Sequence, residues 1–383
     1  MTLTRTFTAF FESEKVAAAL LVLCTLVSLS IANSAFGPAY LSFWQISLLG
    51  LSLEHWVNDA LMAIFFLLIG LELERELYVG ELSDLRNALL PIVAAMGGIM
   101  VPAGIHFALN SGTPTQAGMG IPMATDIAFA LGALSLLGKR VPASLKIFLA
   151  ALAVMDDLGA IIVIAVFYST QFSLVYLLAA LGVFAALIVA NRMRVLSLIP
   201  YLVGGLLMWF FMVKSGVHAT IAGVLLAFAI PFTGRADKED SPSHRLEHAL
   251  HKPVAFIILP IFALANTGVV FDPQWREGLL SANSLGVMGG LLVGKPLGIV
   301  VFCALAVALG ICRLPSQLRW PHIVGAGLLS GIGFTMSIFI TNLAFADNLA
   351  LINSSKMAVL FASATAGVAG VLWLLAIRPA KPQ

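Results

Sequence analysis

Two adjacent carboxylates lie in the middle of a long apolar stretch of this sequence. Asp156 and Asp157 are surrounded by Leu, Ala, Val and Ile residues between positions 147 and 168. An ionised side chain at the centre of a bilayer costs about 3 kcal/mol on insertion scales, so a pair of them indicates a site for ions or protons. The alternative is that the two carboxylates only join helices to one another, and the cost of burying charge disfavours it.

Few other ionisable residues fall inside or at the ends of apolar stretches. They are Asp59, Asp126, Lys295, Glu72 and His218. Successive residues of a helix point about 100° apart, so we expect Asp156 and Asp157 to have different roles. One carboxylate would bind the transported ion, and the other could pair with Lys295, whose charge would otherwise be unpaired in apolar surroundings.

The composition of the chain indicates an all-α polytopic membrane protein. Of its 383 residues, 60% are hydrophobic and 10% are charged, whereas soluble domains carry about 25% charged residues. The net charge of +2 gives no reason to expect a nucleic-acid partner. The three cysteines lie in or beside apolar runs, and we expect them to be packing residues rather than parts of a disulfide or metal site.

About 20 helical residues cross a bilayer, and the chain divides into twelve apolar segments of that scale. The predicted segments are 16–33, 57–79, 88–109, 117–138, 143–168, 173–191, 195–213, 217–232, 254–271, 284–311, 320–345 and 356–377. Only three residues separate the seventh segment from the eighth, so these two could also form one span. The first segment follows acidic as well as basic residues and precedes eleven others, and we expect it to be retained rather than cleaved as a signal.

Positively charged residues in the connections predict the orientation of the chain. With both termini in the cytoplasm, only Lys214, Arg276 and Lys356 of the 21 Lys and Arg residues fall on the external side. Lys295 lies within a segment, and all the others fall on the cytoplasmic side. We therefore expect a multi-pass protein of an inner or plasma membrane, with cytoplasmic N- and C-termini.

Two segments carry clusters of helix-breaking residues. The fourth contains Gly118, Gly120 and Pro122 before Thr125 and Asp126, and the eleventh contains four glycines between 325 and 333. Irregular backbone at membrane depth occurs only where protein or a watery cavity satisfies its polar groups, so both segments are expected to be interrupted helices. Asp126 and Lys295 are then candidates to neutralise the opposed positive and negative helix ends. Close packing of small residues is the alternative.

Eight motifs in order along the chain resemble the NhaA type of bacterial sodium/proton antiporter. They are Asn58-Asp59-Ala-Leu-Met-Ala-Ile-Phe-Phe, Gly70-Leu-Glu72-Leu-Glu-Arg75, Ala124-Thr125-Asp126-Ile-Ala-Phe-Ala, Asp156-Asp157-Leu-Gly-Ala, Lys214-Ser-Gly-Val-His218-Ala-Thr, Arg245-Leu-Glu247-His248, Gly294-Lys295-Pro-Leu-Gly and Gly331-Ile-Gly-Phe-Thr-Met-Ser. The resemblance implies a single antiporter domain over 1–383 in a bacterial inner membrane. It also implies inverted repeats near 88–168 and 284–377, with the fourth and eleventh segments unwound and crossing, and the remaining helices as interface and support.

The resemblance also implies roles for individual residues. Asp156 and Asp157 match the ion-binding and proton-carrying pair, Thr125 and Asp126 lie at a helix break, and Lys295 balances charge or pairs with Asp156. A further set matches positions linked to the pH response: Glu72, Arg75, Glu247, His248 and His218. His244 stands where better-known relatives carry Lys, which leaves the activation pH open.

The expected chemistry is exchange at one site. Sodium and lithium ions prefer oxygen ligands, which carboxylates, a Thr hydroxyl and freed backbone carbonyls supply. Burial disfavours the ionised carboxylate, so the empty site holds a proton that the cation must displace. The resemblance implies more than one proton for each Na+, which makes the cycle electrogenic. We expect no enzyme activity and no cofactor, because Na+, Li+ and H+ are the transported substrates.

Two connections between segments, and one histidine at the start of a segment, permit more than one interpretation. The histidines 244, 248 and 251 could form a proton-responsive cluster with Glu247 in a cytoplasmic loop, or the loop could simply be solvated. His218 could be a packing or hydrogen-bonding residue. The external connection between 33 and 56 could form a β-hairpin that pairs across a homodimer, as the resemblance implies, or could lie on the lipid surface.

Three other functions remain to be distinguished. A proton-coupled carrier of an organic solute would need aromatic and hydrogen-bonding side chains at depth, and the sequence has no such cluster. An intramembrane aspartyl protease could use Asp126 with Asp157, but Lys295 fits an ion carrier better. A passive channel is disfavoured because tight carboxylate ligation would slow the flow of ions.

Overall fold

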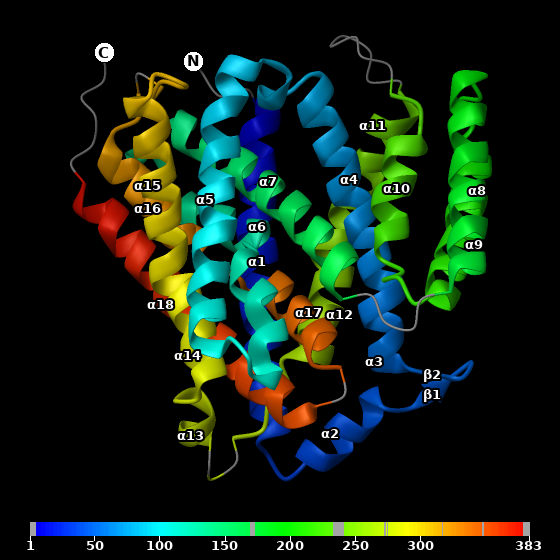
Figure 1. Cartoon of the computed structure of the whole chain (residues 1–383), viewed down its shortest axis with the longest axis horizontal. Helices are drawn as coiled ribbons and strands as arrows, with labels where there is room; N and C mark the ends of the chain where they lie inside the picture. Colours follow the sequence, from blue (N-terminus) through cyan, green and yellow to red (C-terminus); the bar gives the residue numbers. More distant parts are fainter. Residues whose placement is uncertain are drawn as a thin grey trace. The chain divides into compact units, whose positions relative to one another are not determined.

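The computed structural model describes residues 5–168, 173–232, 241–271, 273, 275–315, 317–346 and 348–377. The described chain is almost entirely helical (Figure 1). It divides into two compact units, which we call the first unit (1–37, 84–160 and 266–383) and the second unit (38–83 and 161–265). Each unit combines segments that are distant in the sequence.

The first unit consists of apolar helices with three short irregular ones. The α-helices are α1 (Arg5–Ala32), α5 (Leu85–Asn110), α6 (Ile127–Leu136), α7 (Ala143–Phe167, up to residue 160), α13 (Trp275–Leu279), α14 (Ala282–Gly289), α15 (Lys295–Ala308), α16 (Trp320–Ser330), α17 (Phe334–Ala344) and α18 (Leu349–Ala376). The others are the 3-10 helices η3 (Pro114–Met123) and η4 (Gly138–Arg140) and the π-helix η6 (Gly290–Gly294).

Helices α5 and α15 of the first unit run side by side (Figure 1). Gly97 and Gly298 make this approach possible, because a Cβ atom on either glycine would lie 2.7 Å from the carbonyl carbon of the other. Small residues allow such close contact between helices in a membrane. The contact places α5 beside the helix that begins with Lys295.

The second unit contains most of the remaining helices and two very short strands. Its elements are α2 (Gly37–Trp44), β1 (Ser47–Leu48), β2 (Leu51–Ser52), α3 (Leu53–Trp56), η1 (Val57–Leu61), α4 (Met62–Tyr78), η2 (Glu81–Ser83), α8 (Leu174–Arg192), α9 (Leu198–Ser215), α10 (Ile221–Ala229), α11 (Pro242–Pro253), η5 (Val254–Ile258) and α12 (Leu259–Asn266). Helix α4 contacts both α10 and α11, and α8 pairs with α9 (Figure 1). Tyr201, Met208 and Leu226 belong to the apolar core of this unit.

Strands β1 and β2 pair antiparallel where the sequence predicted a possible hairpin. Ser47 faces Ser52 and Leu48 faces Leu51. The two turn residues, Leu49 and Gly50, both have positive φ angles, as two-residue hairpin turns of type I′ require. The external position of this hairpin and its part in a dimer stay predictions.

Within the described residues, nine helices are long and apolar enough to cross a membrane, and two bent helix pairs raise the number to eleven. This confirms a helical polytopic membrane protein. The eighth predicted segment contains α10, which has only nine helical residues, fewer than the roughly 20 that a crossing needs. The seventh and eighth segments are separate, because α9 ends at Ser215 and the next residue, Gly216, has a left-handed conformation that stops the helix. Twelve crossings therefore remain a prediction.

Two expectations about the connections are wrong. Residues 242–253, expected in a cytoplasmic loop, form α11, which continues through the π-helix η5 into α12. Lys356, expected in an external connection, is buried within α18, because this helix begins at Leu349 with a first turn that the apolar window did not include. Polar residues that continue the helix of an apolar run account for α11, and the uncertainty of helix boundaries read from the sequence accounts for α18.

Candidate ion-binding site

The two interrupted helices of the first unit meet at their breaks. Helices η3 and α6 are separated by residues 124–126 with a bend of 42°, and α16 and α17 are separated by residues 331–333 with a bend of 46°. The backbone nitrogen of Asp126 donates to the carbonyl of Ile332 at 2.7 Å, and the hydroxyl of Thr125 lies 3.0 Å from the carbonyl of Ser330. Backbone groups freed by one break are thus satisfied by the other, as a protein-lined interruption requires.

The carboxylate of Asp126 caps the N-termini of both α6 and α17. Its Oδ1 accepts the backbone N–H of Phe129 at 3.0 Å, and its Oδ2 accepts the backbone N–H of Thr335 at 3.0 Å. The Thr335 hydroxyl donates to the same Oδ2 at 2.5 Å. A helix N-terminus carries about half a positive charge, so one buried carboxylate lies where two partial positive charges meet.

Lys295 forms an ion pair with Asp156 in the interior of the first unit. The Nζ atom lies 2.5 Å from Asp156 Oδ2 and 2.5 Å from the Thr125 hydroxyl. Thr125 Oγ1 lies 2.6 Å from the same Oδ2. The side chains of Lys295 and Asp156 are both 0% exposed, so this ion pair is fully removed from solvent.

Local backbone geometry positions these groups. Lys295 is the first residue of α15 and directly follows the π-helical turn η6, and π-turns inside helices are frequent at functional sites. Asp156 and Asp157 project from the middle of the regular helix α7. Helix α5 also lies close to Asp156, because a Cβ atom on Gly98 of α5 would lie 3.6 Å from Asp156 Oδ1. A glycine here leaves the carboxylate close to the α5 backbone.

Asp156 and Asp157 are both buried but face different surroundings. Asp156 Oδ2 is occupied by the ammonium and the hydroxyl, while its Oδ1 has no hydrogen-bond partner within the part of the chain that the structure describes. Asp157 is 1% exposed, and its charge interacts with that of Lys295. A buried carboxylate oxygen without a donor is a ready ligand for a small cation.

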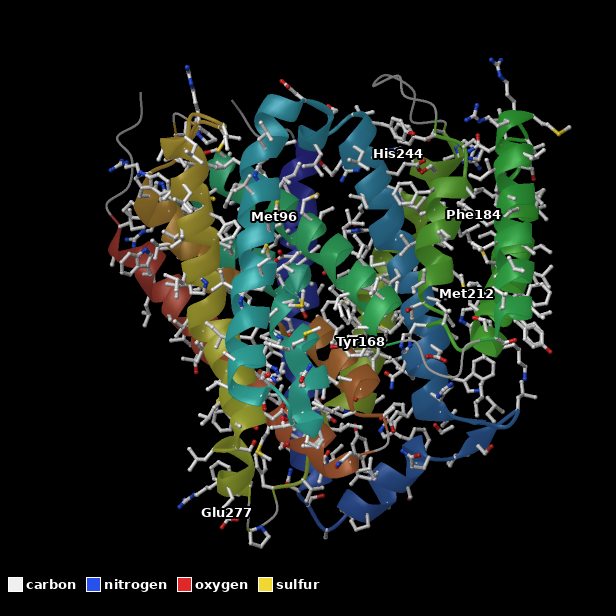
Figure 2. The ribbon with its side chains drawn as sticks, viewed as in Figure 1. Met96, Tyr168, Phe184, Met212, His244 and Glu277 are labelled. Carbon is white, nitrogen blue, oxygen red and sulfur yellow. The ribbon has the colours of Figure 1, made fainter. Side chains whose placement is uncertain are left out.

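A second cluster of charged residues lies in the second unit, and we call it the Arg75–Glu247 cluster (Glu72, Arg75, His244, Glu247 and His251). Arg75 Nε donates to Glu247 Oε1 at 2.9 Å, and His244 Nδ1 lies 3.5 Å from Glu247 Oε2. His251 Nδ1 lies 3.8 Å from Glu72 Oε1. The cluster joins α4 to α11, and Figure 2 labels His244, which lies near the start of α11.

The structure brings together three of the five residues matched to the pH response. Glu72, Arg75 and Glu247 belong to the Arg75–Glu247 cluster, whereas His248 is exposed on α11. His248 follows Glu247 directly and is therefore rotated by about 100° around the helix axis. His218 lies in another part of the second unit, where its Nε2 donates to the carbonyl of Tyr168 at 2.7 Å.

Some partners of the predicted residues were missed from the sequence. Thr335 supplies two donors to Asp126, and Ser243 donates to the buried carboxylate of Glu74 at 2.7 Å. Thr335 follows the glycine cluster of the eleventh segment, which signalled a break but not its partner. Asp59, counted among the membrane-depth carboxylates, pairs with His55 at 2.9 Å in the second unit.

Comparisons with known proteins agree with the resemblance stated from the motifs. A family model described as Na+/H+ antiporter 1 matches residues 8–374. The chain is 72% identical over 373 residues to a protein of Dechloromonas aromatica (strain RCB) named Na(+)/H(+) antiporter NhaA, covering 97% of this chain and 96% of that protein. It is 59% identical over 374 residues to a protein of the same name from Cytophaga hutchinsonii, covering 98% and 96%. For the protein of that name from Vibrio campbellii the identity is 47%, covering 97% and 95%.

The relatives are bacterial, they are named as transporters, and the matches extend over almost the whole chain. Together with the apolar helices, they establish a multi-pass bacterial membrane protein. The resemblance to the NhaA type is thereby confirmed. This chain belongs to the Na+/H+ antiporter 1 family.

Proposed function

We propose that this protein exchanges internal Na+ or Li+ for external H+ across the bacterial inner membrane, as a secondary transporter for sodium and pH homeostasis. One observation carries the proposal: Asp156, Asp157 and Lys295 are all buried where two interrupted helices meet. The relatives named above are sodium/proton antiporters, which supports the identity of the substrates.

The proposed cycle rests on competition for the same oxygen atoms. Na+ is held by the carboxylates of Asp157 and Asp156, with Thr125 as a neutral oxygen ligand beside them. Without the cation, two neighbouring carboxylates share the positive charge of one ammonium, and burial favours uptake of protons. The site therefore carries protons in one direction and the cation in the other.

The proposed exchange is electrogenic. Asp156, Asp157 and Lys295 together can release more than one proton when Na+ binds, so each cycle moves net positive charge inward. The proton-motive force then drives Na+ out of the cell. The three groups interact closely enough to titrate as a unit, so the second proton is a property of the set.

Two sets of residues outside the ion ligands have proposed roles. Asp126 and Lys295 balance the partial charges at the two breaks, and the contacts of Asp126 with both helix N-termini support this. The pH response is assigned to Glu72, Arg75, Glu247, His248 and His218. Of these, the first three gain support from their shared cluster with His251 and His244.

The proposed architecture is one antiporter domain over residues 1–383 with twelve crossings and cytoplasmic termini. Segments near 88–168 and 284–377 form inverted repeats, and their interrupted helices cross. The β1–β2 hairpin lies on the external side and pairs with its copy across a homodimer. The helices of both copies are embedded in membrane lipid. Its exposed leucines, Leu48 and Leu49, support a contact with a second copy.

The test is the internal pH of everted membrane vesicles acidified by respiration. Addition of Na+ or Li+, but not K+, is expected to make the interior rapidly alkaline in the wild type and to have no effect in Asp157→Asn. Lys214→Ala, which changes an exposed lysine, is the matched control and should retain exchange. No response to any of the three cations would refute the proposal. Uptake assays with organic solutes and peptide-cleavage assays would then test the alternatives.

A further inference from the structure

Two hydroxyl groups contact backbone carbonyls between the interrupted helices of the first unit, one in each direction. The Thr125 hydroxyl, at the first break, lies 3.0 Å from the carbonyl oxygen of Ser330, the last residue of α16. The Ser337 hydroxyl, in the first turn of α17, donates to the carbonyl oxygen of Ile121 near the end of η3 at 2.7 Å. Each interrupted segment thus supplies a hydroxyl to the other. Thr125 belongs to the proposed ion site, and the contact made by Ser337 is its counterpart.

The break in the first interrupted segment leaves the carbonyl of Ile121 in need of a donor. Helix η3 ends at Met123, and Ala124 has extended backbone with φ −80° and ψ 149°. The last carbonyls of a helix have no partner in a following turn. Ile121 is 0% exposed, and a buried carbonyl without a donor is unfavourable. The Ser337 hydroxyl, which is also 0% exposed, satisfies this carbonyl.

The start of α17 is itself held by other elements of the first unit. The backbone N–H of Phe334 donates to Ser363 Oγ on α18 at 3.1 Å. The backbone N–H and the hydroxyl of Thr335 both donate to the carboxylate of Asp126. These contacts fix the first turn of α17, which therefore provides a firm support. The hydroxyl of Ser337 ties the end of η3 to that support.

The attachment lies four residues before Thr125 in the sequence. The two residues beside Thr125 both have extended backbone, so helical hydrogen bonds do not hold the break in place. The Thr125 hydroxyl nevertheless lies 2.6 Å from Asp156 Oδ2. Its position therefore depends on what anchors the two sides of the break. Asp126 anchors the α6 side through its cap, and the bond from Ser337 to Ile121 anchors the η3 side.

We propose that Ser337 is a positioning residue for the cation site. Its hydroxyl holds the end of η3 so that Thr125 stays within reach of Asp156. Ser337 acts through the carbonyl of Ile121 and not as an ion ligand, so its loss weakens cation binding while every proposed ligand remains. The inference rests on the proposed function and adds a residue of α17 to the groups that set the affinity for Na+ and Li+.

The test is the dependence of exchange on Na+ concentration in proteoliposomes at one fixed pH, for wild type and Ser337→Ala. We expect the KM for Na+ to rise about three- to tenfold, the range that one hydrogen bond contributes. The maximal rate per folded protein should change less than about twofold, because the groups that exchange the proton are intact. The KM for Li+ should rise in the same way. Ser337→Cys, which keeps a weak donor of similar size, should give an intermediate KM.

The matched control is Ser135→Ala on α6. Ser135 is also buried, but its hydroxyl donates to the carbonyl of Gly132 in its own helix at 2.6 Å, so its loss should leave the KM unchanged. Thermal unfolding shows which variants are folded.

An unchanged KM in folded Ser337→Ala, or a lower maximal rate with unchanged KM, would overturn the inference. If Ser337→Ala does not fold, the KM of Ser337→Cys decides, and a value equal to that of the wild type would overturn the inference. Absence of exchange in the wild type would instead refute the proposed function.

Discussion

Two charged clusters in the described part of this protein contain ion pairs that differ in their exposure to solvent. Lys295 and Asp156 lie 2.5 Å apart with both side chains 0% exposed, whereas Arg75 and Glu247 lie 2.9 Å apart with side chains 40% and 13% exposed. A buried pair leaves a costly unpaired charge when one partner is lost, and an exposed pair is screened by water. The difference in burial, more than the difference in distance, distinguishes the proposed ion-carrying group from the proposed pH-responsive group.

The histidines follow the same division. His244 and His251 contact carboxylates in the Arg75–Glu247 cluster, where each is partly exposed to solvent. The buried site is built from two carboxylates, a hydroxyl and an ammonium. The Arg75–Glu247 cluster is therefore the group to which we assign the pH response, apart from the proposed ion ligands.

The largest effect is expected from Lys295→Ala. It leaves the charge of Asp156 buried without its counter-charge, which costs about 3–5 kcal/mol in buried ion pairs. Thermal unfolding in detergent measures the loss, and Lys214→Ala, an exposed lysine, should change stability by less than about 0.5 kcal/mol.

The double variant Lys295→Met with Asp156→Asn sharpens this prediction. Because it removes both charges, it should recover most of the stability, and we expect no exchange because an ion ligand is lost. If Lys295→Ala alone proves as stable as Lys214→Ala, the buried pair is not the desolvated pair described above.

A smaller effect is expected from Asp126→Asn. The amide keeps one oxygen but places an NH₂ group against a backbone or hydroxyl donor, and it loses the charge that two helix N-termini favour. We expect a loss of about 2 kcal/mol in unfolding measurements. Asn348→Ala removes a single exposed cap of α18 and serves as comparison, with a loss of about 1 kcal/mol. Equal losses would argue against a shared cap.

The smallest effect on stability is expected from Glu247→Gln. Arg75 is 40% exposed, so water screens this pair on one side, and screened ion pairs contribute about 0.2–1 kcal/mol. The free energy of unfolding should therefore change less than in the two variants above. The dependence of exchange on cytoplasmic pH should nevertheless shift, because Glu247 is the shared partner of Arg75 and His244. His251→Gln should shift this profile more than His248→Gln, since His248 lies exposed on α11. The reverse order would favour His248 over His251 in the pH response.

The sequence predicted the parts of the fold that depend on local properties. Apolar length identified the membrane helices, and the glycine and proline clusters identified both interruptions before any partner was known. The cost of an unpaired buried charge predicted that Lys295 pairs with one of the two adjacent carboxylates, and the family resemblance named Asp156 as that partner. The helix α11 was missed because hydropathy does not detect a polar helix that continues into an apolar one.

Other features could not be predicted because their partners are distant in the sequence. Thr335 and Asp126 are 209 residues apart, and Ser337 and Ile121 are 216 residues apart. Neither Thr335 nor Ser337 has a residue type that by itself indicates a site. Helical phase also decided which histidine of α11 reaches a carboxylate, and the start of that helix was not known from the sequence.

The most direct test of the central claim is the number of protons released when Na+ binds. Titration calorimetry of the purified protein in two buffers with different ionisation enthalpies gives this number at neutral pH. Competition at the buried carboxylates predicts release of between about one and two protons per Na+, and no Na+ binding to Asp157→Asn. Binding of Na+ without any proton release would contradict the claim that cation and proton compete for the same site.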